Sequence, residues 1–206
     1  ATARATTRTR KPDRASRWRH RSFAHRGWRS ACSTLADVPG CEDARNAGFD
    51  QIVGKYVVFL DGDDFYEPTL LEKMYSAIHR DDADISVCNY KTFYESMQKF
   101  SDPRIDFQTF KKQSPVSYKT NPSDIFNVST LMFWNKMFRS DLLREHGIRN
   151  DEKLHRAQDI DFVGRALVEA KSIAVVDEPL AYYRTDTGTS NVSGLYKHPY
   201  DVVRSL

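Results

Sequence analysis

The chain has 206 residues, which is enough for one domain with a sizeable core, and its formal net charge is +3 at pH 7. It contains no run near the roughly 18 apolar residues of a transmembrane helix and no apolar core of a secretory signal, so we expect neither. Its three cysteines, Cys32, Cys41 and Cys88, are scattered without C-x-x-C spacing. This pattern argues against disulfides and zinc sites and favours a reducing compartment.

The first forty residues differ in composition from the rest of the chain. Residues 1–30 hold nine Arg and one Lys against one Asp, a net charge of +9, which leaves about −6 for the other 176 residues. The segment has no helical or alternating apolar period. It can be interpreted as an arm for nucleic acid or an anionic membrane, a transit peptide, a disordered tail, or a stretch that is not the natural N-terminal half. We favour the last and expect no nucleic-acid partner.

A strand followed by acids is the strongest signal in the chain. Residues 42–53 predict a helix, and the five apolar residues Tyr56–Leu60 then predict a strand buried on both faces. Asp61, Asp63 and Asp64 follow directly. Because unpaired buried carboxylates are costly, we expect all three acids to face water, a cation or both at the carboxyl end of the strand. Closely spaced carboxylate oxygens suit magnesium or manganese when substrate phosphates complete the coordination.

Other interpretations use the same acids. An EF-hand loop starting at Asp61 would need Gly where Tyr66 stands, and a helix rather than a strand before it. A phosphatase of the aspartyl-phosphate type usually has Thr or Val where Phe65 stands. The third possibility is that Asp63 and Asp64 merely cap the next helix, and it stays open.

The following elements alternate between helices and strands. Residues 67–80 predict an amphipathic helix with the inward stripe Leu70, Leu71, Met74, Tyr75 and Ile78. Residues 84–93 predict a strand in which Cys88 is a core thiol, and residues 94–125 predict loops or weak strands. The second half predicts a short strand within 129–138, a helix over 140–146, a helix from Asp159 to about Ala170, strands at 173–176 and 180–183, and a helix from 195.

Several short motifs follow one another at fitting intervals. They are Ala44-Arg45-Asn46-Ala47-Gly48, Gly54-Lys55-Tyr56, Phe59-Leu60-Asp61-Gly62-Asp63-Asp64, Trp134-Asn135-Lys136, Asp159 and Tyr183-Arg184. In this ordered set, over roughly residues 43–192, the chain resembles the inverting glycosyltransferases of family 2. The resemblance implies a GT-A-like α/β fold with a mostly parallel sheet flanked by helices and an irregular or incomplete N-terminal part. It divides the chain into a basic, disordered or non-native segment (1–40) and a partial glycosyltransferase domain (41–206).

The resemblance assigns residues to the donor. Asp63 would bind the divalent metal, Mn²⁺ or Mg²⁺, that holds the diphosphate of a nucleotide sugar, and Asp61 would serve the nucleotide and the metal. Arg45 would lie near the nucleotide and its phosphates, although pairing with an acid such as Asp50 is equally open. Arg184 and Ser190 would lie on a loop that closes over the diphosphate. The alternative for Arg184 is a surface ion pair at a sheet edge.

The resemblance also assigns the sugar pocket and the base. Trp134 would form the floor of a sugar ring with Asn135 beside it, and Lys136 would meet phosphate or a sugar hydroxyl. The alternative is a core Trp and a surface Lys.

Asp159 would be the catalytic base that takes the proton of the acceptor hydroxyl. Gln158 stands where the family usually has Glu, so a supporting charge is absent. Asp161 is a weaker candidate for the base, and capping of the helix is the other interpretation of Asp159.

The implied function is inverting, metal-dependent transfer of a sugar from a UDP-linked donor to the hydroxyl of a glycan or lipid-linked acceptor, in surface polysaccharide or cell-wall glycan synthesis. The expected location is cytoplasmic, with possible peripheral association at the inner face of the membrane. Two alternatives remain. The family's Pro-x-Tyr-Asn and Asp-Asp-Gly-Ser elements are not visible, so the chain could be an inactive or sugar-nucleotide-binding fragment. It could also bind an anionic polymer through residues 1–30.

Overall fold

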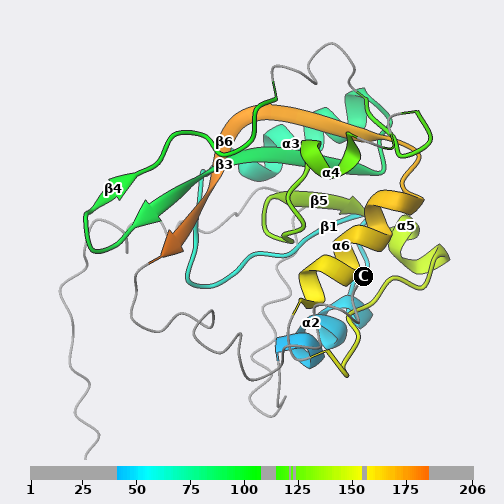
Figure 1. The fold of residues 1–206 in the computed structure, drawn as a ribbon. Coiled ribbons are helices and arrows are strands. Elements are labelled where there is room, and N and C mark those ends of the chain that lie inside the picture. Colours follow the sequence, from blue (N-terminus) through cyan, green and yellow to red (C-terminus); the bar gives the residue numbers. More distant parts are fainter. Residues whose placement is uncertain (1–40, 108–114, 121, 123, 155–156, 186–206) are drawn as a thin grey trace, which may run out of the picture.

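The computed structural model describes residues 41–107, 115–120, 122, 124–154 and 157–185 (Figure 1). Its elements are α2 (Cys41–Asp50), β1 (Tyr56–Val58), β2 (Phe65–Tyr66), α3 (Leu70–Arg80), β3 (Ile85–Tyr94), β4 (Lys99–Phe100), α4 (Ile125–Val128), β5 (Lys136–Arg139), α5 (Ser140–Glu145), α6 (Gln158–Glu169) and β6 (Ile173–Thr185). The basic segment 1–40, Ser190 and the helix predicted from residue 195 lie outside the described residues.

The described strands form one mixed sheet in the order β1-β5-β3-β6-β2, with β4 pairing the far end of β3. The predicted α/β architecture with flanking helices is confirmed, but the expectation of a mostly parallel sheet is wrong. Only β3 and β6 pair in parallel, and the other four pairings between these strands are antiparallel. The reason is β5, which lies reversed between β1 and β3 and makes those two strands run the same way without touching (Figure 1).

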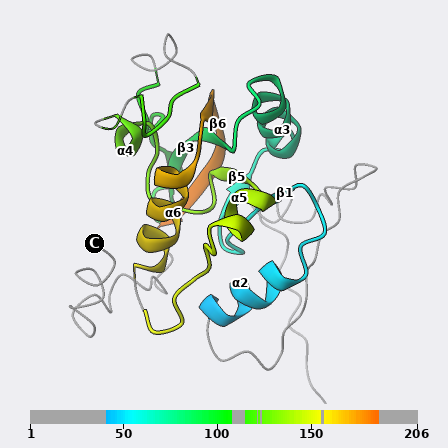
Figure 2. The ribbon, with the colours of Figure 1, turned by 90° about the vertical axis from the view of Figure 1, so that its right-hand side faces the viewer.

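Helices cover both faces of this sheet, with α3 on one side and α6 on the other (Figure 2). Successive residues of β3 point to opposite faces. Ile85 and Val87 therefore join the apolar cluster that contains Phe162 of α6, while Cys88 joins the cluster that contains Met74 of α3. Both clusters are largely excluded from water. The strand predicted over Tyr56–Leu60 differs: β1 covers only Tyr56–Val58, stands at one end of the described strand order and is half-buried, and Leu60 is 38% exposed.

Two local predictions are refined. Cys88 is a fully buried free thiol, as expected, and burial raises its pKa to about 12. On α3 the predicted inward stripe holds except at Tyr75, which is 41% exposed. Its ring stacks on His79 at a centroid distance of 5.7 Å and meets Tyr56 of β1 edge-on, also at 5.7 Å, so it lies at the exposed border of the stripe.

The two short strands predicted at 173–176 and 180–183 are one long strand, β6, that bends between them. Its parallel register against β3 shifts on both sides of Asn89, whose partner is Pro179. Extra residues at such bulges bend a strand and increase its twist, and Pro is tolerated there because it has no N–H to donate. Beyond the bend, Tyr90 of β3 and Tyr183 of β6 line one pocket.

Four phenylalanines fix the elements that carry the site. Phe133 and Phe162 have ring centroids 4.8 Å apart, and Phe59 lies 5.3 Å from Phe133 and 5.6 Å from Phe162. Phe138 of β5 lies 5.7 Å from Phe162. These rings join the end of β1, the loop before β5 and the first turn of α6. Tilted and edge-to-face pairs of this kind add to the free energy gained by burial.

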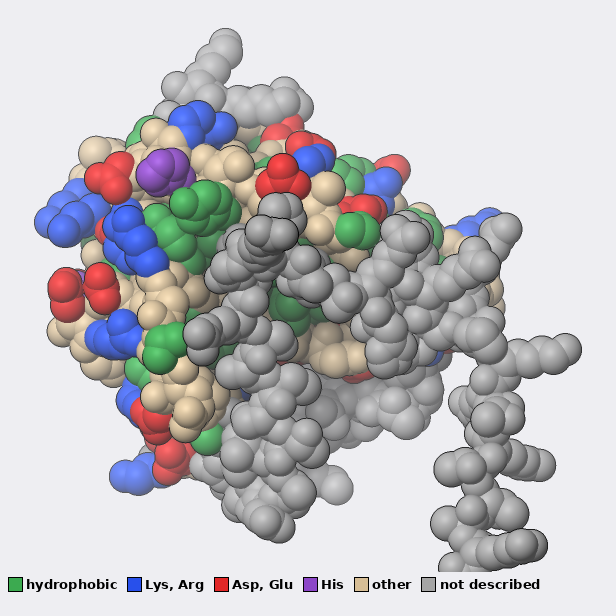
Figure 3. Space-filling view, turned by 180° about the vertical axis from the view of Figure 1, so that it is seen from behind, with side chains coloured by type: hydrophobic (Ala, Val, Ile, Leu, Met, Phe, Trp, Pro, Cys, Tyr) green, Lys and Arg blue, Asp and Glu red, His purple; other side chains and the backbone are tan. Residues whose placement is uncertain are grey.

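On the outside, the face seen from behind shows acidic and basic side chains interspersed rather than gathered by sign (Figure 3). Within the part of the chain that the structure describes, no helix is long and apolar enough to cross a membrane.

We expect Phe162→Ala to lower the free energy of unfolding by about 3–5 kcal/mol, because it removes a buried ring and leaves a cavity beneath the site. Val168→Ala on the same helix is the control, since Val168 is 40% exposed and should change stability by only about 0.5 kcal/mol. Urea unfolding followed by circular dichroism measures both. Equal losses in the two variants would contradict the packing described here.

Candidate active site

A tight turn carries the acids at the end of β1. The N–H of Asp64 donates to the carbonyl of Asp61 at 3.3 Å, which leaves Asp63 exposed at the tip of the turn. The N–H of Asp61 donates to the hydroxyl of Tyr66 at 2.9 Å, so the turn is closed from both ends. Asp63 faces water, as the sequence predicts, whereas Asp61 is half-buried and contacts Arg45.

Asp64 departs from the prediction that all three acids face water. It is only 5% exposed, and its Oδ1 accepts the backbone N–H of Arg184 at 2.9 Å. Its Oδ2 has no hydrogen-bond partner among the described residues, and burial raises the pKa of Asp64 to about 7. The hydrogen bond and the raised pKa together make a buried carboxyl tolerable. The capping interpretation is also wrong, because Thr69 precedes α3 and no side chain caps that helix.

Arg45 links two acids that are far apart in the sequence. Its Nη2 lies 3.3 Å from Oδ1 of Asp61, and its Nη1 lies 3.8 Å from Oδ1 of Asp159. The guanidinium also lies over the ring of Phe133, 4.7 Å from its centroid. The alternative pairing with Asp50 is wrong, because Asp50 pairs with Arg149. The structure therefore brings Arg45, Asp61 and Asp159 together.

Asp159 is the second residue of α6, where a negative charge is stabilised by the helix dipole. The helix follows Ala157, whose left-handed backbone (φ 62°) is uncommon for a residue other than glycine. The pKa of Asp159 is raised to about 6, chiefly by burial and also by the nearby charge of Asp61. Arg45 opposes the shift, as does a hydrogen bond from the backbone of Phe133. The group can therefore exchange a proton near neutral pH.

Gln158 and Asp161, the neighbours of Asp159, make different contacts. The side chain of Gln158 is buried, and its Nε2 donates to the carbonyl of Leu154 at 2.9 Å. It anchors the start of α6. Asp161 pairs with Arg165 one turn further along the helix at 2.6 Å. The structure thus places Asp159, and not Asp161, against Arg45.

Lys136 is fully buried, so the alternative of a surface Lys is wrong. Its Nζ donates to the carbonyls of Thr130 and Met132 at 2.5 and 2.6 Å and to Oδ1 of Asn135 at 2.7 Å. Burial lowers its pKa to about 7. These three bonds use all of its donors and fix the loop that carries Phe133. A contact with phosphate or a sugar hydroxyl would require Lys136 to leave these partners.

Trp134 and Asn135 lie where the same loop meets β3. Asn135 is buried, and its Nδ2 donates to the carbonyl of Cys88 at 3.0 Å, so it supports the pocket without facing it. The ring of Trp134 is parallel to that of Tyr183, with centroids 5.8 Å apart and an interplanar angle of 3°. Tyr90 meets Trp134 edge-on at 4.8 Å. The rings form one aromatic wall, in which Trp134 is only 3% exposed and belongs to the core cluster of α3, as the alternative of a core Trp predicts.

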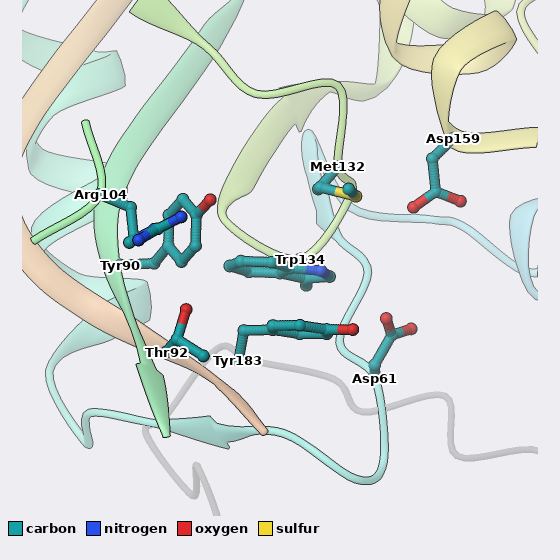
Figure 4. A pocket seen from close by; sticks show the side chains of 8 residues that line it. All are labelled: Asp61, Tyr90, Thr92, Arg104, Met132, Trp134, Asp159 and Tyr183. Carbon is teal, nitrogen blue, oxygen red and sulfur yellow. The ribbon is translucent and has the colours of Figure 1, made fainter. Parts of the chain in front are cut away.

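These groups line a pocket of about 350 Å³. Figure 4 shows its eight lining residues, which are Asp61, Tyr90, Thr92, Arg104, Met132, Trp134, Asp159 and Tyr183. Sequence reasoning assigned roles only to Asp61, Trp134 and Asp159. Tyr183 belonged to a recognised motif without a role, whereas Tyr90, Thr92, Arg104 and Met132 gave no signal, because nothing in their local pattern shows that the fold brings them to one cavity.

Two hydrogen bonds hold Arg184, one through its backbone and one through its side chain. Its N–H donates to Asp64, and its Nε donates to Oε2 of Glu95 at 2.6 Å. The ion pair that the alternative interpretation predicts is thus present, and the role over the diphosphate stays a prediction. The same holds for Ser190, which the structure does not describe.

The described residues contain no group of three or more His, Cys, Asp and Glu side chains arranged to hold a metal ion. Asp63 and Asp61 offer two carboxylates, one of which contacts Arg45. Magnesium and manganese accept such oxygen ligands but need several more. The arrangement would fit a cation whose remaining ligands are water and the oxygens of a bound diphosphate.

We expect Arg45→Met to raise the pKa of Asp159 above its wild-type value, because the guanidinium charge that opposes the shift is removed while an unbranched side chain that can still cover Phe133 is kept. The matched control is Arg149→Met, since Arg149 also pairs with an acid and also covers a phenylalanine, Phe49. A ¹³C NMR titration of the Asp159 carboxyl group measures the shift. An unchanged titration in Arg45→Met would show that the two groups are not coupled.

Comparison with known proteins gives the family. The sequence model described as Glycosyl transferase family 2 matches residues 20–147, which is more than half of the chain. The match begins inside the basic segment, and the predicted domain boundary near residue 40 stays a prediction. The putative glycosyltransferase EpsH of Bacillus subtilis is 30% identical over 148 residues, covering 70% of this chain and 42% of that protein. The cholesterol galactosyltransferase of Borreliella burgdorferi is 27% identical over 168 residues, covering 77% and 46%.

Solved structures agree with this result. Residues 1–349 of Staphylococcus aureus TarS in complex with UDP-GlcNAc superpose with a TM-score of 0.63 at 25% identity, covering 81% of this chain and 44% of that one. The poly(ribitol-phosphate) beta-N-acetylglucosaminyltransferase TarS is also 26% identical in sequence over 180 residues, covering 86% of this chain and 29% of that protein. The chain therefore spans less than half the length of each of these relatives. With the matching family model and the pocket between Asp61 and Asp159, the comparisons show that this chain belongs to Glycosyl transferase family 2.

Proposed function

We propose that the chain carries the active site of an inverting glycosyltransferase that moves a sugar from a UDP-linked donor to an acceptor hydroxyl in surface polysaccharide or cell-wall glycan synthesis. One observation carries the proposal. Asp61, at the end of β1, and Asp159, at the start of α6, face the same pocket and are joined by Arg45. A candidate donor-binding residue, Asp61, and a candidate base, Asp159, thus line the same cavity.

Asp159 suits the base in this reaction. As the acceptor oxygen forms its bond to the anomeric carbon, its proton passes to the carboxylate of Asp159. The bond from that carbon to the diphosphate oxygen breaks, and UDP leaves with the electron pair. Attack from the side opposite the leaving group inverts the anomeric centre. With a pKa near 6, Asp159 is deprotonated at neutral pH yet is a stronger base than an ordinary carboxylate.

The donor end is supported by the relatives. TarS has been solved with UDP and with UDP-GlcNAc, which supports a nucleotide-sugar donor for this chain. Asp63, which is exposed at the tip of its turn, would hold Mn²⁺ or Mg²⁺ together with Asp61 and the diphosphate. The cation would neutralise charge that develops on the departing diphosphate. The acceptor would be a glycan or lipid-linked glycan.

A second function, binding of a nucleotide sugar without transfer, is favoured by one observation. Gln158 is buried and bonded to the backbone, so it supplies no charge beside Asp159. The two functions differ in whether Asp159 affects turnover.

We expect Asp159→Asn to lower the turnover number by about 10²–10⁴, the usual contribution of a general base, while the affinity for UDP stays the same. The matched control is Asp161→Asn in the same turn of α6, which should stay within about twofold because Asp161 faces Arg165. Release of UDP from a panel of UDP-sugars, with a mixed oligosaccharide pool as acceptor, measures turnover. Equal turnover by both variants would exclude Asp159 as the base.

The pH dependence gives a separate prediction. The base must be deprotonated to accept a proton, so kcat/KM should fall as pH drops below about 6 and reach a plateau above it. An ordinary aspartate would move this limb to about pH 4. The profile is measured by UDP release between pH 4.5 and 8.5, in buffers of constant ionic strength. A flat profile down to pH 5 would contradict the raised pKa.

A further inference from the structure

We propose that the end of the pocket remote from Asp159 is an acceptor subsite for an anionic group, either a phosphodiester or a carboxylate, bound by Arg104. The inference rests on the proposed function, because it assumes that the acceptor hydroxyl is presented to Asp159. It adds the chemical class of the acceptor, and it rests on a part of the pocket to which the sequence assigned no role.

The pocket has two unlike ends. Figure 4 shows the carboxylates of Asp61 and Asp159 on one side of the Trp134 and Tyr183 rings and the guanidinium of Arg104 on the other. A negative group on an acceptor is repelled by the first end and attracted by the second. The distribution of charge therefore orients a bound acceptor, with its reacting hydroxyl toward Asp159 and its anion toward Arg104.

Arg104 differs from the other arginines around the site. Arg45 contacts Asp61 and Asp159, and Arg184 contacts Glu95. In the described part of the chain, no carboxylate lies within ion-pair distance of Arg104, whose side chain is exposed. An unpaired guanidinium on a pocket wall offers a planar fork of donors that matches phosphate and carboxylate oxygens.

Hydrogen bonds to β3 hold the backbone at Arg104 in place. Its N–H donates to the carbonyl of Tyr90 at 2.9 Å. The next residue, Ile105, is held by the buried side chain of Asn89, which donates to its carbonyl at 2.7 Å and accepts its N–H at 3.1 Å. Asn89 occupies the irregular position of β3, opposite Pro179 of β6. The same bulge that bends the sheet thus anchors the backbone that carries Arg104.

The middle of the pocket suits a sugar or polyol. The parallel rings of Trp134 and Tyr183 and the edge of Tyr90 form a continuous apolar wall between the charged ends. Aromatic surfaces of this kind cover the C–H faces of a sugar ring by burial. In Figure 4 the hydroxyl of Thr92 points toward the pocket beside Arg104, where it can donate to an acceptor oxygen.

The test compares three short probes that differ in charge: a galacturonate trimer, a neutral galactose trimer and a glycerol-phosphate trimer. Each is titrated calorimetrically into the wild-type chain, Arg104→Ala and Arg104→Lys at fixed ionic strength and in the presence of UDP and Mn²⁺. Arg80→Ala is the matched control, because Arg80 is an exposed arginine on α3 whose ion pair among the described residues is with its neighbour Asp81. Thermal unfolding confirms that all variants are folded.

We expect at least one anionic trimer to bind more tightly than the neutral one, and Arg104→Ala to weaken that binding by about 10- to 100-fold. Arg104→Lys should lose less, and Arg80→Ala nothing. Preference for the glycerol-phosphate or the galacturonate probe identifies the anion. Equal affinity of all three probes, or unchanged binding in Arg104→Ala, would overturn the inference.

UDP titrated alone into the same samples keeps the two proposals apart. If UDP binds and no anionic probe depends on Arg104, only the subsite is wrong. If UDP does not bind while an anionic probe binds through Arg104, the anion site at Arg104 stands, but both the proposed transfer function and the assignment of that site to an acceptor fall.

Discussion

The arrangement of the site depends on one partly buried contact, the bridge that Arg45 makes between Asp61 and Asp159. Two carboxylates that share a pocket repel each other, and burial raises the free energy of the charged form of Asp159. A guanidinium between them offsets both effects, since its fixed fork of donors can face two carboxylates at once. Without it, no ion pair among the described residues would join the end of β1 to the start of α6.

Buried polar groups around this bridge hold the loops that the apolar cores cannot reach. Lys136 binds two carbonyls of the loop before β5, and that loop donates the backbone hydrogen bond to Asp159. On the other side, the carboxyl group of Asp64 binds the N–H of Arg184 and fastens the acidic turn to β6. Both groups lie outside water with pKa values displaced toward neutrality. Each is therefore a positioning group whose removal would leave buried backbone groups unpaired.

The sequence predicted the helices and strands well, because their apolar periods are read from local residues. The positions of Arg45, Asp61 and Asp159 followed from the ordered motifs of the family. Other features depend on contacts between distant segments. The burial of Asp64 requires the pairing of β2 with β6, and the burial of Lys136 requires a loop to fold back over it. Neither contact leaves a local signal, so both residues were assigned to the surface or to the ligand.

For the same reason, the direction of the strands and the basic end of the pocket could not be predicted from the sequence. β5 is a four-residue strand, and nothing in its composition shows that it runs against both neighbours. Arg104 lies in a stretch without periodicity, and its position depends on Asn89 at a bulge. The family resemblance predicted Asp61 and Asp159 at one end of the cavity, whereas the position of Arg104 at the other end follows only from the structure.

The most direct test of the central claim is calorimetric titration of UDP into the chain, with and without Mn²⁺, in the wild-type protein and in Asp63→Ala. Asp141→Ala is the control, because Asp141 is an exposed aspartate on α5 whose ion pair, within the part of the chain that the structure describes, is with Arg144 of its own helix. The account predicts Mn²⁺-dependent binding that weakens at least about tenfold in Asp63→Ala and is unchanged in Asp141→Ala. No binding of UDP by the folded wild-type chain, or equal binding by all three proteins without Mn²⁺, would contradict it.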